Sequence, residues 1–209
     1  MLLYHVDRIK NMTFKIITDS TCDLPKEVVQ HLGITVVPLT VHFGSETYKD
    51  GVELSSDEFY HRLMTEPNLP KTSQPSVGEF VQAYESVIQG GESIISLHIS
   101  SKVSGTYNSA IQASRQISGN CDIKIVDTEQ VSMGLGLIVM AAAKLANQDT
   151  SMEETLKYVR EAIKRCECFA LLDTMEYLEK GGRIGKARAL LGTFLNIKPL
   201  IILRDGEVH

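Results

Sequence analysis

Short apolar, β-branched runs alternate with helical patterns along most of this chain, and that alternation limits its fold more than any other feature. Strands are predicted at residues 14–18, 34–42, 93–99 and 122–126, and helices at 25–32, 55–64, 76–89, 106–117, 133–147 and 151–165. Strands separated by helices at this spacing pair in parallel. We therefore predict an α/β fold, with a mainly parallel sheet that carries helices on both faces.

Helix-terminating and helix-capping residues support several of these boundaries. Asp23 is a predicted N-cap ahead of Pro25, and Gly33 is the predicted stop of the same helix. Ser or Thr followed three residues later by Glu forms a capping box, which here marks helix starts at Ser55, Ser76 and Ser151. Parallel sheets bind ligands beyond the carboxyl ends of their strands, so the loops after residues 18, 99 and 126 are the places to look for a site.

The sequence divides into three parts. Residues 1–11 precede Met12 and are predicted to be an N-terminal extension; residues 12–166 form the α/β domain. Residues 167–209 are predicted to be the start of a second, α+β domain, with strands at 169–172 and 198–203 and helices at 173–180 and 187–195. An Asp-Gly turn at 204–207 predicts a hairpin whose return strand is missing. This second domain is therefore expected to be incomplete and to expose apolar surface.

Charge, hydropathy and cysteine content exclude several classes of protein. The formal net charge is −5, because 21 Lys and Arg stand against 26 Asp and Glu, so nucleic-acid binding is not expected. No apolar run reaches the roughly 18 residues of a membrane span, and we expect a cytosolic protein. Four cysteines without a C-x-x-C pair predict neither a disulfide scaffold nor a metal site. Cys22, in a predicted loop, is the one reactive-thiol candidate.

Common catalytic and nucleotide-binding motifs fail in this sequence. Gly185-Lys186 lacks both the first glycine and the hydroxyl residue of a P-loop. The chain has no Gly-x-Ser-x-Gly nucleophile elbow. His98 lies within a predicted strand, and we interpret it as a hydrogen-bonded core histidine rather than a general base.

Two hydroxyl-rich segments remain. One is Thr72-Ser73-Gln74-Pro75-Ser76; the other spans residues 100–109 and joins the end of a strand to the start of a helix. Hydroxyls beside free backbone N–H groups at a helix N-terminus form an anion site, and Gly105 would let an anion approach the backbone. The alternative is ordinary capping, in which Ser76 and Ser104 satisfy their own helices. The residues alone leave both interpretations open.

The ordered motifs of the chain resemble the DegV family of bacterial fatty-acid-binding proteins. The resemblance is carried by T-D-S-T-C-D-L-P at 18–25, T-S-Q-P-S at 72–76, S-G-T-Y-N-S at 104–109, D-T at 127–128, L-E-K-G-G-R-I-G at 178–185 and N-I-K-P-L at 196–200. It implies a two-domain fold with a long-chain fatty acid in a tunnel between the domains. The ligand-binding residues that it implies are Thr72, Ser73, Ser104, Gly105 and Arg183, with the carboxylate held by Thr72 and Ser104.

The resemblance also implies a carrier that presents the carboxylate to an ATP-dependent fatty acid kinase for acyl-phosphate formation. Such a carrier performs no catalysis, holds no cofactor besides the bound fatty acid and can contact a membrane transiently. Two alternatives belong to other classes. One is a hydrolase or acyltransferase with Ser104 or Cys22 as nucleophile, and the other is a carrier of a different anionic amphiphile.

Overall fold

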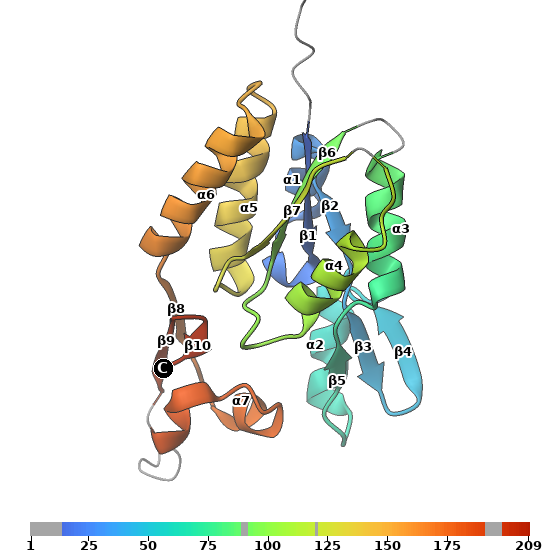
Figure 1. The fold of residues 1–209 in the computed structure, drawn as a ribbon. Helices are drawn as coiled ribbons and strands as arrows, with labels where there is room; N and C mark the ends of the chain where they lie inside the picture. The colour runs from blue at the N-terminus through green and yellow to red at the C-terminus, as the bar shows by residue number, and fades with distance from the viewer. Residues whose placement is uncertain (1–13, 89–91, 120, 191–197) are drawn as a thin grey trace, which may run out of the picture.

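The computed structural model describes residues 14–88, 92–119, 121–190 and 198–209 (Figure 1). The predicted extension at 1–11 lies outside these ranges. No helix within them is long and apolar enough to cross a bilayer.

A four-stranded parallel sheet forms the centre of the chain, as predicted. Its strands are β1 (Phe14–Asp19), β2 (Thr35–Val37), β6 (Ser93–His98) and β7 (Ile123–Asp127), in the order β2-β1-β6-β7. All six residues of β6 are buried, which is typical of a central strand covered on both faces. The register aligns Ile16 with Ile95, and Ser96 with Ile125.

Helices cover both faces of this sheet (Figure 1). One face carries α1 (Lys26–Leu32), α5 (Ser132–Ala146) and α6 (Met152–Arg165), whose apolar side chains share a core with β1 and β6. The other carries α3 (Val77–Ile88) and α4 (Thr106–Ser114), which pack against the second face through a core centred on Phe80 and Tyr84. The predicted α/β architecture is therefore confirmed.

The strand predicted at 34–42 is wrong as a single element. It is split into β2 and a separate strand β3 (Thr40–Phe43). Pro38 lies at the break, where it has no N–H to donate to a neighbouring strand. β3 pairs antiparallel with β4 (Glu46–Lys49) and β5 (Lys71–Ser73), in the order β4-β3-β5. Helix α2 (Ser56–Thr65) packs on this small sheet through Phe59.

Most predicted caps are present, but the one at Asp23 is wrong. Ser55 accepts a hydrogen bond from the N–H of Glu58, and Gly33 ends α1 with a φ of 66°. Asp23 instead adopts a left-handed conformation that closes the 3-10 turn Ser20–Cys22, and the N-cap position of α1 falls on Pro25. The carboxylate that caps in this region is Asp19, which accepts from the N–H of Thr21.

The C-terminal residues form a second small antiparallel sheet, in the order β10-β9-β8. Its strands are β8 (Cys168–Leu171), β9 (Leu200–Arg204) and β10 (Glu207–Val208), and α7 (Glu176–Lys180) and the 3-10 helix Gly185–Leu190 lie between β8 and β9. The predicted hairpin is confirmed, with positive φ at Asp205 and Gly206. The return strand that was expected to be missing is present as β10. Of the helix predicted at 187–195, residues 191–195 lie outside the described ranges.

One face of this second sheet is apolar and exposed. Leu171 of β8 lies opposite Leu200 of β9, and these two side chains are 67% and 64% exposed. Phe169, two residues before Leu171 and on the same face, is 55% exposed. The opposite face is covered, because Leu203 and Val208 pack against Ile184. The apolar surface expected for residues 167–209 is thus observed.

Candidate functional site

Four buried polar side chains form a linear series of hydrogen bonds near the carboxyl ends of the strands of the parallel sheet, which we call the carboxyl edge. The Nδ1 atom of His98 lies 2.9 Å from the Asp19 carboxylate, and its Nε2 atom lies 2.6 Å from the Ser96 hydroxyl. The Tyr84 hydroxyl lies 3.0 Å from that of Ser96. A carboxylate only accepts, so in the neutral imidazole Nδ1 donates to Asp19, Ser96 donates to Nε2 and Tyr84 donates to Ser96.

This series has the residue types of a catalytic triad but no access to substrate. Asp19, Ser96, His98 and Tyr84 are all 0% exposed. The ring edge of Phe80 also meets the imidazole, with 5.0 Å between ring centroids. A nucleophile must reach its substrate, so Ser96 cannot serve as one. The prediction that His98 is a hydrogen-bonded core histidine is confirmed.

His98 also joins the three loops that leave the carboxyl edge. Through Asp19 it contacts the loop after β1, and the backbone N–H of Ile99 donates to the same carboxylate at 3.2 Å. Its carbonyl accepts from the N–H and hydroxyl of Thr128, at 3.1 and 2.7 Å, in the loop after β7. The backbone N–H groups of Ile99 and Thr128 are thereby both hydrogen-bonded within the protein. The loop after β6, which begins the Ser100–Gly105 segment, therefore starts from a fixed position.

Ser104 lies half-buried near the end of that segment, two residues before the start of α4. Its hydroxyl lies 2.9 Å from the hydroxyl of Thr106 and 3.3 Å from the Thr106 N–H. Ser76 has the simpler role of a capping residue. It accepts from the Glu79 N–H at 3.2 Å, while the Glu79 carboxylate accepts from the Ser76 N–H at 2.8 Å. The capping interpretation thus holds for Ser76, and it holds in part for Ser104, which accepts from the first N–H of α4 and keeps part of its surface exposed.

The two hydroxyls of β5 lie on opposite faces of the strand, because successive side chains alternate. The Ser73 hydroxyl lies 2.8 Å from Nε2 of His42 on β3. Thr72 lies opposite Val41 on the other face and is exposed. Within the described ranges, no protein group forms a hydrogen bond with the Thr72 hydroxyl. A ligand on one face of β5 can therefore contact only one of these two side chains directly.

Gly105 is covered by a side chain rather than open to an anion. A Cβ atom placed on Gly105 would lie 2.0 Å from Oε1 of Gln74. The expected open approach to the backbone is therefore wrong on this side of the glycine, where the Gln74 amide fills the space. The contact joins the T-S-Q-P-S segment to the S-G-T-Y segment.

Arg183 is exposed and reaches the loop that carries Ser104. Its guanidinium donates to the carbonyl of Gly181 at 2.6 Å and, through Nε, to the carbonyl of Val103 at 3.4 Å. The hairpin turn of the second sheet docks nearby, since the Ser100 hydroxyl donates to the Gly206 carbonyl at 2.7 Å. The structure thus brings Arg183 to the loop that carries Ser104 and Gly105, and it joins the Thr72–Ser76 segment to that loop through Gln74.

The nucleophiles considered in the sequence analysis lack the surroundings of catalytic groups. Cys22 is only 2% exposed, and burial raises the pKa of its thiol to about 11. A thiol with such a pKa stays protonated near neutral pH and is a poor nucleophile. The hydroxyl of Ser104 contacts Thr106 and not a base. Within the described ranges, no cluster of three His, Cys, Asp or Glu side chains could hold a metal ion.

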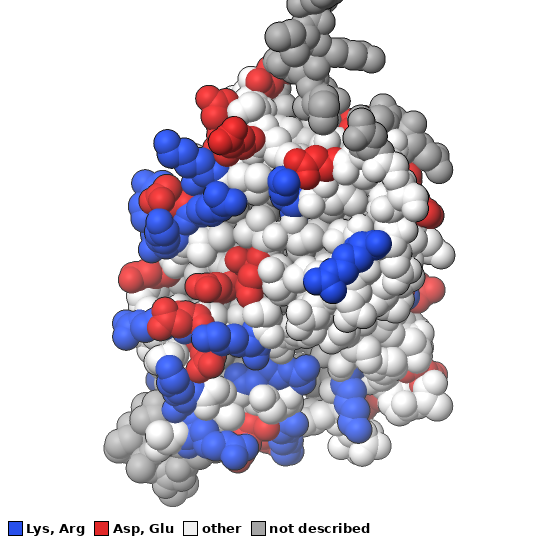
Figure 2. Space-filling model, in the orientation of Figure 1, with Lys and Arg blue, Asp and Glu red and all other residues white. Residues whose placement is uncertain are grey.

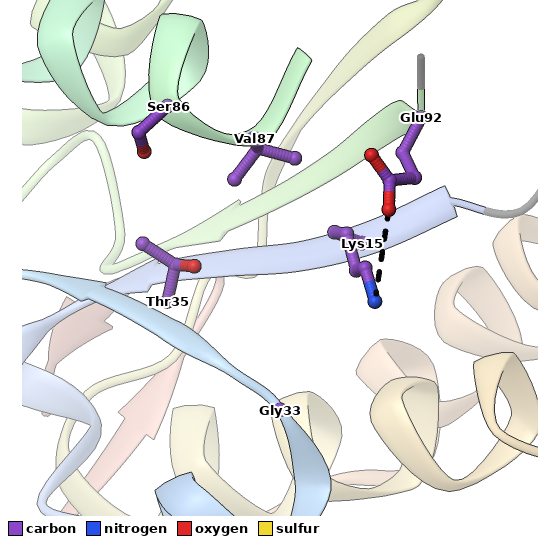
Figure 3. Close-up of a pocket in the computed structure, with 6 residues that line it drawn as sticks. All are labelled: Lys15, Gly33, Thr35, Ser86, Val87 and Glu92. Carbon is purple, nitrogen blue, oxygen red and sulfur yellow. Dashed lines mark ion pairs between the residues drawn. The ribbon is translucent and has the colours of Figure 1, made fainter. Parts of the chain in front are cut away.

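A surface pocket of about 310 Å³ lies at the other edge of the sheet (Figure 3). It is lined by Lys15, Gly33, Thr35, Ser86, Val87 and Glu92, which lie near the amino ends of β1, β2 and β6. Lys15 and Glu92 form an ion pair of 3.9 Å across it. The carboxyl-edge loops contribute nothing to this pocket, so we do not place the predicted site there.

On the face seen in Figure 2, acidic side chains lie among the basic ones.

Comparisons with known proteins identify the family of the chain. Residues 13–209 match the family described as "Uncharacterised protein, DegV family". A DegV domain-containing protein of Deinococcus radiodurans is 41% identical over 197 residues, which cover 94% of this chain and 69% of that protein.

Two solved structures share the fold over nearly the whole chain. One is a DegV family protein from Thermus thermophilus, described by its fatty acid binding, with a TM-score of 0.87 and 37% identity over 95% of this chain and 70% of that one. The other is a stearic-acid-binding protein from Eubacterium ventriosum, with a TM-score of 0.88 and 33% identity over 93% of this chain and 68% of that one. By these matches, this chain belongs to the DegV family.

Proposed function

We propose that this chain binds a long-chain fatty acid, with the carboxylate at the carboxyl edge of the parallel sheet. The observation that carries the proposal is that Gln74, directly after β5, and Arg183 both contact the loop that carries Ser104 and Gly105. Its support from outside the chain is the fatty acid binding of solved relatives with the same fold.

The polar groups at this edge suit a carboxylate. The unpaired hydroxyl of Thr72 and the hydroxyl of Ser104 would each donate a hydrogen bond to it. The backbone N–H groups at Gly105 and the first turn of α4 would add the partial positive charge of a helix N-terminus. Arg183 would supply the opposite full charge. In this arrangement Ser73 supports β5 through His42 and does not contact the ligand.

The acyl chain would lie in a tunnel between the domain of residues 12–166 and the segment of residues 167–209. Each buried CH2 group contributes about 0.8 kcal/mol, so a long chain supplies most of the binding free energy. The carboxylate would then determine how the ligand is oriented, because hydrogen bonds and ion pairs are directional.

We further propose that the bound carboxylate is presented to an ATP-dependent fatty acid kinase, which forms the acyl phosphate. The chain itself lacks the P-loop sequence that would bind ATP phosphates. In this proposal the chain is a cytosolic carrier that takes up its ligand during transient contact with a membrane. Ser104 and Thr72 would hold one carboxylate oxygen in position to attack the γ-phosphate.

The test compares two double variants in a fluorescent fatty-acid displacement assay. Thr72→Ala with Ser104→Ala removes the two proposed ligand hydroxyls and should weaken fatty acid binding by at least about ten-fold. Thr35→Ala with Ser86→Ala removes the same two residue types from the pocket at the opposite edge and should leave binding unchanged.

Mass spectrometry of the purified wild-type protein after organic extraction identifies the ligand. About one fatty acid per chain supports the proposal. A different anionic amphiphile would show that the ligand is not a fatty acid. Equal affinity of the Thr72/Ser104 variant and the wild type would refute the proposed carboxylate site. Acyl-phosphate production with a cognate kinase tests the second step separately.

A further inference from the structure

Gln74 connects two segments that are 31 residues apart in the sequence but share the proposed site. Its Nε2 atom donates to the Ser109 hydroxyl at 3.0 Å, and Ser109 is only 4% exposed. Its amide lies directly over Gly105, where a Cβ atom would be 2.0 Å from Oε1 and 2.7 Å from Nε2. The side chain therefore lies across the first turn of α4.

The need for glycine at position 105 is steric and not conformational. Gly105 has a φ of −75°, which any L-amino acid adopts easily. A Cβ atom there would overlap the Gln74 amide, and this flexible side chain would have to move away from its present position. Glycine thus leaves room for the amide in its present position, and an alanine at position 105 would displace it.

The residues on either side of Gln74 are fixed by contacts within the protein. Within the described part of the chain, the Thr72 hydroxyl has no such contact. Ser73 bonds to His42 at 2.8 Å, Pro75 is buried, and Ser76 caps α3. Thr72 is the residue of T-S-Q-P-S that faces away from these contacts. A strand rises about 3.3 Å per residue, so Thr72 lies within roughly 7 Å of Gln74 along β5. Ser104 directly precedes Gly105 on the other side of the contact.

We propose that Gln74 is a positioning residue that sets the separation of the Thr72 and Ser104 hydroxyls. This inference rests on the proposed function, because it assigns those hydroxyls to one carboxylate. Two donors bind the two oxygens of a carboxylate well only when their separation matches the ligand. Gln74 fixes that separation without contacting the fatty acid.

The experiment uses Gln74→Ala, Gly105→Ala and the double variant, with Gln112→Ala as control. Gln112 is exposed on α4, the helix that begins directly after Gly105. Each single change should weaken binding of a long-chain fatty acid on the order of ten-fold. The double variant should be no weaker than Gln74→Ala alone, because the new methyl group enters space that the amide has left. Gln112→Ala should bind like the wild type.

Two further readouts separate positioning from a general loss of structure. The methyl ester of the same fatty acid has no carboxylate, so its affinity should be similar in all five proteins. Hydrogen–deuterium exchange should rise at residues 71–73 and 104–109 in Gln74→Ala and remain at the wild-type level in the core strand β6.

Each outcome decides between the two proposals. If wild-type protein binds the acid and Gln74→Ala keeps the wild-type preference for acid over ester, the role of Gln74 is wrong and the proposed function stands. Additive losses in the double variant would also overturn the role, since the steric link predicts non-additivity. If the wild type binds no fatty acid, the proposed function fails, and the positioning role fails with it.

Discussion

The buried hydrogen-bonded series Tyr84–Ser96–His98–Asp19 predicts an unusual result for a Tyr84→Phe substitution. The substitution should lower the free energy of unfolding when residue 96 is Ser and raise it when residue 96 is Ala. In the wild type, this change removes one hydroxyl that donates to Ser96 at 3.0 Å, while Ser96 keeps its bond to His98. The loss of one such bond lowers the free energy of unfolding by about 1 kcal/mol.

Ser96→Ala acts differently, because it leaves both neighbours of Ser96 without a partner. The Tyr84 hydroxyl and Nε2 of His98 would remain buried, and each unpaired group costs about 1–3 kcal/mol. Adding Tyr84→Phe to Ser96→Ala then removes one of the two unpaired groups. The second substitution should therefore raise stability by about 1–3 kcal/mol in this background, although it lowers stability in the wild type.

Urea unfolding of the wild type, the two single variants and the double variant measures this coupling. Tyr60→Phe is the matched control, because Tyr60 is 63% exposed and should change stability by less than about 0.5 kcal/mol. Equal destabilisation by Tyr84→Phe in both backgrounds would refute the hydrogen-bonded series. It would also remove our reason for regarding Ser96 as fully engaged.

Two further predictions concern Gly206 and Cys22. Gly206→Ala combines a φ of +75° with a Cβ atom 2.6 Å from Oγ of Ser100, so it should destabilise the docked hairpin and raise hydrogen exchange in β9 and β10. Gly44→Ala has a similar φ of +59° and nothing within 4 Å, so it should show the backbone effect alone, and equal effects of the two would contradict the docking contact. Burial raises the pKa of Cys22 from 9.0 to about 11, so the stabilisation by its neutral thiol is complete below pH 9 and is lost as pH rises through 11. The stability difference between wild type and Cys22→Ala should therefore shrink over that range, and a constant difference in pH-dependent urea titrations would refute the shift.

Local sequence signals were sufficient for the parallel sheet and most helix ends. Short apolar, β-branched runs placed β1, β6 and β7 to within about a residue, because strands of a sheet covered on both faces are largely apolar. Capping boxes and Gly33 act within four residues, and such short-range contacts can be read from sequence. Pro38 could have indicated the break between β2 and β3, because proline has no N–H to donate to a neighbouring strand, but no break was predicted there.

The errors at the site involve contacts between distant residues. Strand alternation separates Thr72 from Ser73, but this argument requires knowing that residues 71–73 form a strand, and no strand was predicted there. The role of Gln74 depends on a contact with Ser109, which no periodicity indicates. Asp19 was part of a recognised motif, yet its partner His98 is 79 residues away. The family motifs gave the order of these segments without giving their partners.

Hydroxyl groups at the carboxyl edge fall into two sets, and their hydrogen bonds separate structural from ligand-binding candidates. Ser96 and Tyr84 are fully buried and are each engaged by a protein partner, so neither can donate to a ligand without breaking an existing bond. Thr72 is exposed and faces away from the contacts that hold its strand. A carboxylate arriving here gains hydrogen bonds only from hydroxyls that water solvates in the free protein, since a buried pair would have to be broken first. In the proposed site, the exposed Thr72, and not the triad-like Ser96, is therefore the hydroxyl that would change partners when a ligand binds.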